Sequence, residues 1–105
     1  MSMSEQTTQV SPTELVKWAL AHERAADGCA TARSDNQRTA AAAASWGPLF
    51  HEARRATINA VNAREATLVE QERRHRAMAA QLRKGAAEME EMNAQNRAML
   101  TISTD

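Results

Sequence analysis

Only one stretch of the sequence carries the signals of a turn between helices, Ser45-Trp46-Gly47-Pro48. Glycine commonly follows the last turn of a helix, and proline fits the first turn of the next one. Before this stretch, only Gly28 weakens a helix, at a cost of about 1 kcal/mol that does not end it. We therefore predict two helices with a very short connection, which makes them antiparallel. We also expect Gly47 to adopt a conformation that needs glycine.

The first helix has a clear start. Ser11-Pro12-Thr13-Glu14 has the form of a capping box, with Ser11 as the N-cap residue. The predicted fold class is all-α, a two-helix antiparallel hairpin with a longer second helix. Its expected parts are a flexible tail at 1–10, the hairpin at 11–100 and a second tail at 101–105, with helix 1 at about 12–45, the turn at about 46–48 and helix 2 at about 48–100.

The chain has few large apolar side chains for a core of its own. It holds thirteen Leu, Ile, Val and Phe residues among 105, and much of its hydrophobic content is alanine. Alanine is the best helix former, so the chain is strongly helical. A small core makes a monomer marginal, and association is the usual remedy. We therefore expect two hairpins to assemble into a four-helix bundle, either as a homodimer or with a related hairpin.

Each predicted helix has a stripe that repeats every three or four residues. Folding the chain at Gly47 places residues opposite each other when their numbers add up to about 94, so that Ala32 faces Val61 and Ala25 faces Leu68. Small residues then meet large ones. The stripe of the first helix is Leu15, Trp18, His22, Ala25, Cys29, Ala32, Asn36, Thr39 and Ala43, and that of the second is Phe50, Val61, Leu68, His75, Met78, Leu82, Met89, Met92 and Met99.

The second helix is longer than the first, about 78 Å against about 50 Å at 1.5 Å per residue. Beyond about Leu82 nothing from the first helix lies beside it, yet its apolar stripe continues. Methionine suits adaptable contacts with a partner. We therefore predict an interface that includes Trp18, Leu82, Met89, Met92 and Met99.

Composition and motifs point away from several other functions. The formal net charge is zero and aromatic residues are 3% of the chain, which disfavours nucleic acid as the partner. No stretch is apolar and long enough to span a membrane. We expect no cofactor, no metal and no enzyme activity. One remote alternative is a metal-dependent bundle; the residues available to it are His22, Cys29, Glu72 and His75, although Glu72 fits a solvated charged face better.

The turn and the second helix resemble a known family. Ser45-Trp46-Gly47-Pro48-Leu49-Phe50, Arg64 to Leu68 and His75 to Leu82 are similar to the EspC-like proteins associated with ESX (type VII) secretion, which are related to the WxG-type secretion substrates of mycobacteria. In this chain Trp46 and Gly47 are adjacent, whereas a WxG motif has one residue between them. Trp46, Gly47 and Pro48 form the turn motif, where Trp46 either caps the end of the hairpin or serves as a docking element.

The resemblance implies a non-enzymatic secretion substrate or accessory protein that forms helical dimers and contacts type VII secretion components. The family's export signal is Tyr-x-x-x-Asp/Glu after the second helix. The corresponding stretch here has Met89 in place of tyrosine and Asn93 in place of the acid. The expected location is therefore secreted or in the cell envelope, with a partner carrying the signal, or otherwise cytoplasmic. The alternative function is a cytoplasmic coiled-coil adaptor or regulatory scaffold that is not exported.

Overall fold

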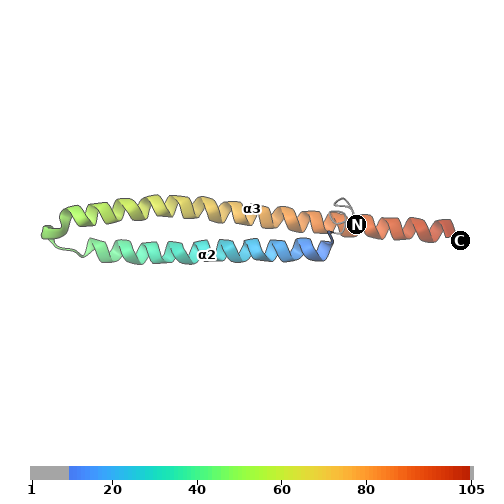
Figure 1. Cartoon of the computed structure of the whole chain (residues 1–105), viewed down its shortest axis with the longest axis horizontal. Helices are drawn as coiled ribbons and strands as arrows, with labels where there is room; N and C mark the ends of the chain where they lie inside the picture. Colours follow the sequence, from blue (N-terminus) through green and yellow to red (C-terminus); the bar gives the residue numbers. More distant parts are fainter. Residues whose placement is uncertain (1–9, 105) are drawn as a thin grey trace, which may run out of the picture. The chain divides into compact units, whose positions relative to one another are not determined.

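A computed structural model describes residues 10–104, which form two antiparallel helices joined by a short turn (Figure 1). Helix α2 spans Pro12–Ala44, a single 3-10 turn η1 spans Pro48–Phe50, and helix α3 spans His51–Thr104. No strand occurs within these residues, so the predicted all-α hairpin is confirmed. Helix α3 ends four residues later than expected. The other residues of the two predicted tails, 1–9 and 105, lie outside the described residues.

The chain divides into two compact units, which we describe separately. The turn unit is Glu23–Arg76, and the terminal unit combines the described residues of Met1–His22 with those of Ala77–Asp105. No helix in the described part is long and apolar enough to cross a membrane.

The predicted cap at the start of α2 is present. The Ser11 Oγ accepts a hydrogen bond from the Glu14 backbone N–H at 3.2 Å, and the Ser11 carbonyl accepts one from Leu15 N–H at the same distance. The first bond satisfies an N–H group that a helix start leaves without a partner, and the second is the first backbone bond of the helix.

Helix α2 ends without a left-handed glycine, so the expectation for Gly47 was wrong. Ser45 and Trp46 donate backbone hydrogen bonds to the Ala42 and Ala43 carbonyls at 3.2 and 3.1 Å, which tightens the last turn. Gly47 has φ −74° and ψ 176°, an extended conformation open to any residue. The neighbouring proline favours this conformation because its ring excludes the helical one for the residue before it.

The helices meet along a narrow seam of small side chains. In the turn unit the buried residues are Ala26, Asn36 and Ala43, and in the terminal unit they are Ala19, Ala79 and Ala86. Alanine lets two helix backbones approach closely. Buried and half-buried residues recur every three or four positions: Leu15, Ala19, His22, Ala26, Cys29, Arg33, Asn36, Ala40 and Ala43 on α2, and Arg54, Ile58, Val61, Glu65, Leu68, Glu72, His75, Ala79, Leu82, Ala86 and Met89 on α3.

Every second residue of the stripe predicted for the first helix therefore lies one position before the residue that the seam contains. The seam runs through Ala19 and Ala26, where Trp18 and Ala25 were expected. An indole is too large for such a close approach, and Trp18 remains 45% exposed beside the seam.

The predicted register was also wrong, by about one heptad. In the turn unit, the Asn36 Nδ2 lies 3.4 Å from the Glu65 Oε2, whereas the expected register put Asn36 opposite Ile58. In the terminal unit, the position of a Cβ on Gly85 would lie 3.7 Å from the Leu15 Cδ1, whereas Leu15 was expected opposite Ala79. The connection and the 3-10 turn lie between the helices, so α3 starts later than a fold at Gly47 implies. A shift of one heptad keeps the same faces together.

The register shift also moves the start of the uncovered part of α3. Up to residue 102, where the described exposures end, Met89 is the last half-buried residue of this helix, and residues 90–102 are all exposed. The overhang thus begins about a heptad beyond Leu82, where we expected it.

Replacing Gly28 with alanine is expected to stabilise the protein by about 1 kcal/mol, since glycine weakens a helix interior. A Cβ at Gly28 would meet no atom within 4 Å. The matched Gly47→Ala variant is expected to change the free energy of unfolding by less than about 0.5 kcal/mol, as usual for an uncrowded surface position. Urea unfolding of the three proteins measures both effects. A loss of more than about 1 kcal/mol in Gly47→Ala would show that this position does need glycine.

Candidate interaction surfaces

A charged cluster interrupts the alanine seam in the turn unit. The Arg33 Nε donates to the Glu65 Oε1 at 2.6 Å, and the Arg33 Nη1 donates to the Glu72 Oε1 at 3.1 Å. The arginine on α2 therefore joins two seam carboxylates that are seven residues apart on α3. Charge-assisted hydrogen bonds of this kind are stronger than neutral ones. The Glu72 side chain is only 18% exposed.

The cluster extends to both sides of these three residues. Asn36, which is buried, donates to Glu65, while the Arg76 Nη2 lies 3.2 Å from the Glu72 Oε2 and 3.3 Å from the Asp27 Oδ1. We name the set formed by Asp27, Arg33, Asn36, Glu65, Glu72 and Arg76 the seam network.

The seam network was missed in the sequence, where Glu72 was assigned to a solvated face. A correct seam position would have revealed it, because Arg33, Asn36, Glu65 and Glu72 all fall on the seam repeat. Polar residues at such positions favour one register over others, since a slipped register separates them from their partners.

Arginines lower the pKa of three glutamates in the turn unit. Hydrogen bonds from Arg33 lower the pKa of Glu65 and of Glu72, and Arg76 adds to the effect on Glu72. Hydrogen bonds from Arg73 and Arg74 lower the pKa of Glu70 to about 2. The arginine-rich stretch at 73–76 is thus locally neutralised by acidic side chains.

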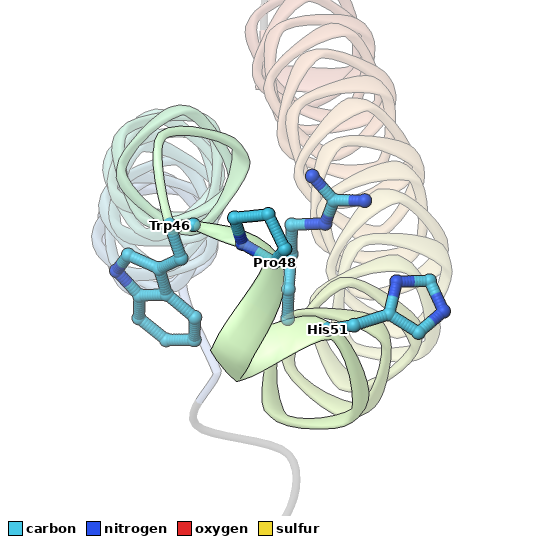
Figure 2. A pocket seen from close by; sticks show the side chains of 5 residues that line it. Trp46, Pro48 and His51 are labelled. Carbon is cyan, nitrogen blue, oxygen red and sulfur yellow. The ribbon is translucent and has the colours of Figure 1, made fainter.

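The predicted turn motif carries an exposed apolar surface. Trp46 and Phe50 are partly exposed, and Leu49 is 92% exposed. Figure 2 shows Trp46 and His51 pointing outward with Pro48 between them. A shallow hollow here is lined by Trp46, Gly47, Pro48, His51 and Arg54, and a second one lies between Trp46, Phe50 and Ala53.

All five residues of the predicted interface belong to the terminal unit. Leu82 and Met89 are half-buried on the seam. Trp18, Met92 and Met99 are exposed, the two methionines by 60% and 68%. The predicted interface left out four further apolar side chains that are exposed in this unit: Leu20, Met78, Leu100 and Ile102.

The residues considered for other chemistry lie as follows. Of the two residues predicted to stand at the positions of the export signal, Met89 is half-buried and Asn93 is exposed. Of the possible metal ligands, Glu72 is held by Arg33 and Arg76. Among residues 10–104 there is no group of three or more His, Cys, Asp or Glu side chains placed to hold a metal ion.

The lowered pKa values of Glu65 and Glu72 predict a defined acid sensitivity. Both pKa values lie below the ordinary 4.5. Their stabilising contribution is therefore complete above about pH 4.5 and is lost as the pH falls through the folded-state values. The double variant Glu65→Gln, Glu72→Gln should melt below the wild type at pH 7, and the difference in Tm should shrink from pH 4.5 to pH 3.

Thermal melting followed by circular dichroism at several pH values tests this expectation. Glu90→Gln, at an exposed position of α3, is the control and should show no comparable convergence. A Tm difference for the double variant that stays constant from pH 7 to pH 3 would contradict the role given to the seam network.

Comparison with known proteins identifies the family of the chain. No curated protein and no solved structure matches it. A family model described as excreted virulence factor EspC, type VII ESX diderm, matches residues 3–101, which include both helices almost entirely and the turn between them. The resemblance of the turn and the second helix is thereby confirmed over the length of the hairpin. The chain belongs to the EspC family of type VII ESX secretion.

Proposed function

We propose that this protein is a non-enzymatic substrate of type VII secretion that acts through helix-to-helix contacts with another helical hairpin. The observation that carries the proposal is the family match over residues 3–101. This range includes the paired helices and the uncovered part of α3 as far as Thr101. The excreted character of the family supports export of this chain.

The packing of the hairpin supports a function in association. Its buried apolar residues are alanines alone in the described part of the chain, while larger apolar side chains lie at the surface of the terminal unit. Burial of apolar surface contributes about 25 cal/mol per Å², so covering those side chains with a second chain would stabilise both proteins.

The electrostatics of the turn unit support a non-enzymatic function. Glu65, Glu70 and Glu72 each accept hydrogen bonds from arginines, and their pKa values are lowered. A catalytic carboxylic acid needs the opposite, a pKa raised toward the working pH. These three glutamates are better suited to hold helices together than to transfer protons.

The stretch at Met89 to Asn93 supports export in company with a partner. It lacks the tyrosine and the acid of the family signal, and Met89 is half-buried in the seam. We therefore propose that a second hairpin carries the complete signal and that the two chains leave the cell together.

Export of the tagged full-length protein tests the proposal directly. We expect it in washed culture filtrate of a host with a working type VII system and its neighbouring secretion genes, and not in filtrate of the same host without the secretion motor. A cytosolic enzyme serves as the lysis control. Retention in the cell pellet of both hosts, with the protein folded and abundant, would overturn the substrate function and favour a cytoplasmic adaptor.

A further inference from the structure

The turn between the helices leaves its large apolar side chains uncovered. Leu49 is 92% exposed and Phe50 57%, and η1 contains no buried residue. Trp46 points outward beside two shallow hollows, neither of which Leu49 lines (Figure 2). Single exposed apolar residues are ordinary on a protein surface, but three large ones within five positions form a patch that indicates a binding surface.

The surroundings of this patch are basic, although the formal net charge of the whole chain is zero. Residues 39–64 hold three arginines and one glutamate, which gives them a formal net charge of +2 with histidine neutral. Within residues 10–104, no ion pair involves Arg54, Arg55 or Arg64, whereas the three arginines at 73–76 each pair with an acidic side chain. The positive charge beside the turn is therefore available to an anionic partner.

The apolar and the basic residues lie at two successive levels. Arg54 and Arg55 follow Phe50 by four and five residues, which is about one helical turn or 5.4 Å along the axis. Arg54 is half-buried and lines the same hollow as Trp46. At the neighbouring end of α2, residues 40–44 are all alanine and bring no acid near these arginines. We name Trp46, Leu49, Phe50, Arg54 and Arg55 the turn tip.

We propose that the turn tip docks on the surface of a membrane that contains anionic phospholipids. Leu49 and Phe50 enter the boundary between headgroups and acyl chains, where interfacial apolar side chains reach a depth of about 5–10 Å. Arg54 and Arg55 then lie among the lipid phosphates, about one helical turn nearer the water, where basic residues add to the affinity. Trp46 suits the headgroup level, because its ring is apolar and its N–H can donate a hydrogen bond.

Charge and shape both favour a membrane over a protein as the partner. The positive charge of the tip complements anionic headgroups. Leu49 protrudes, so a protein would need a pocket shaped for it, whereas lipids rearrange around an inserted side chain. The contact uses the turn alone. It therefore goes beyond the helix-to-helix contacts of the proposed function and does not depend on export.

Vesicle binding by the purified full-length protein tests the proposal. We expect the protein to sediment with vesicles made of equal parts phosphatidylcholine and phosphatidylglycerol. Binding to vesicles of phosphatidylcholine alone should be at least ten times weaker, because neutral headgroups do not attract the arginines. Equal affinity for the two kinds of vesicle would overturn the proposal. Binding to neither would also overturn it and would favour an acidic protein as the partner of the tip.

Removing the apolar part of the tip tests which side chains enter the lipid. Leu49→Ser with Phe50→Ser should lower the affinity for the anionic vesicles at least tenfold. Far-ultraviolet circular dichroism should show unchanged helix content, since both side chains are exposed. Met92→Ser with Met99→Ser is the matched control, because it removes two exposed apolar side chains elsewhere on α3. An equal loss of affinity in the control would show that the tip is not the docking site.

Removing the basic part of the tip tests the contact with phosphate. Arg54→Gln with Arg55→Gln should also weaken binding to the anionic vesicles at least tenfold, with helix content retained. Arg24→Gln with Arg97→Gln removes the same charge at two exposed positions outside the tip and should change the affinity less than twofold. Equal effects of the two pairs would mean that net charge, and not the tip, attracts the protein to the vesicles.

Tryptophan fluorescence reports where the protein meets the lipid. In a Trp18→Phe variant, Trp46 is the only tryptophan. Its emission should move to shorter wavelength and become less accessible to acrylamide when anionic vesicles are added, because the indole leaves water. The reciprocal Trp46→Phe variant, which keeps Trp18, should show neither change. A response from Trp18 without one from Trp46 would place the lipid contact elsewhere and overturn the proposal.

Discussion

The close approach of two helices along an alanine seam is the constraint on which the rest of this structure depends. Ala19, Ala26, Ala43, Ala79 and Ala86 allow the backbones to come near each other, but each buries little apolar area. The larger apolar side chains on the seam, such as Leu82 and Met89, are only half-buried, and Trp18, Met92 and Met99 are exposed beside or beyond it. The hairpin therefore has a well-defined axis of contact together with much apolar surface at its outside. The small size of the buried alanines thus explains both the close packing of the helices and the apolar surface that remains exposed.

The small, uncharged alanines of the seam do little by themselves to distinguish one register from another. The seam network supplies that distinction in the turn unit. Arg33 reaches two carboxylates on the other helix, and Asn36 donates to one of them. A slip of one heptad would leave Arg33 beside only one of the two carboxylates, so the other would lose this partner, at a cost in free energy.

The outline of the fold could be read from the sequence because its signals are local. The cap at Ser11 and the break at Ser45-Trp46-Gly47-Pro48 each depend on neighbouring residues, and the structure has both. The register could not be read in this way. It depends on how many residues the connection uses, and a short 3-10 turn after Gly47 moved the pairing by a heptad. The expectation for Gly47 was also wrong, because the proline that follows it favours an extended backbone at Gly47.

The interaction surfaces were predictable only in part. The exposed positions of Met92 and Met99 agree with a stripe that continues beyond the shorter helix, whereas Trp18 was expected on the seam and is exposed beside it. That these residues form an interface stays a prediction. The seam network was not predicted, since a charged residue on a helix is most often solvated. The predicted stripe also contained Ala32 where the seam contains Arg33.

The chain belongs to the EspC family, and its larger apolar side chains are exposed, so we propose that a second chain covers them. The most direct test of this account is the solution mass, measured by light scattering across a concentration series. The account predicts that the mass approaches twice the chain mass of 11.5 kDa as the concentration rises. A mass of one chain at every concentration would contradict it.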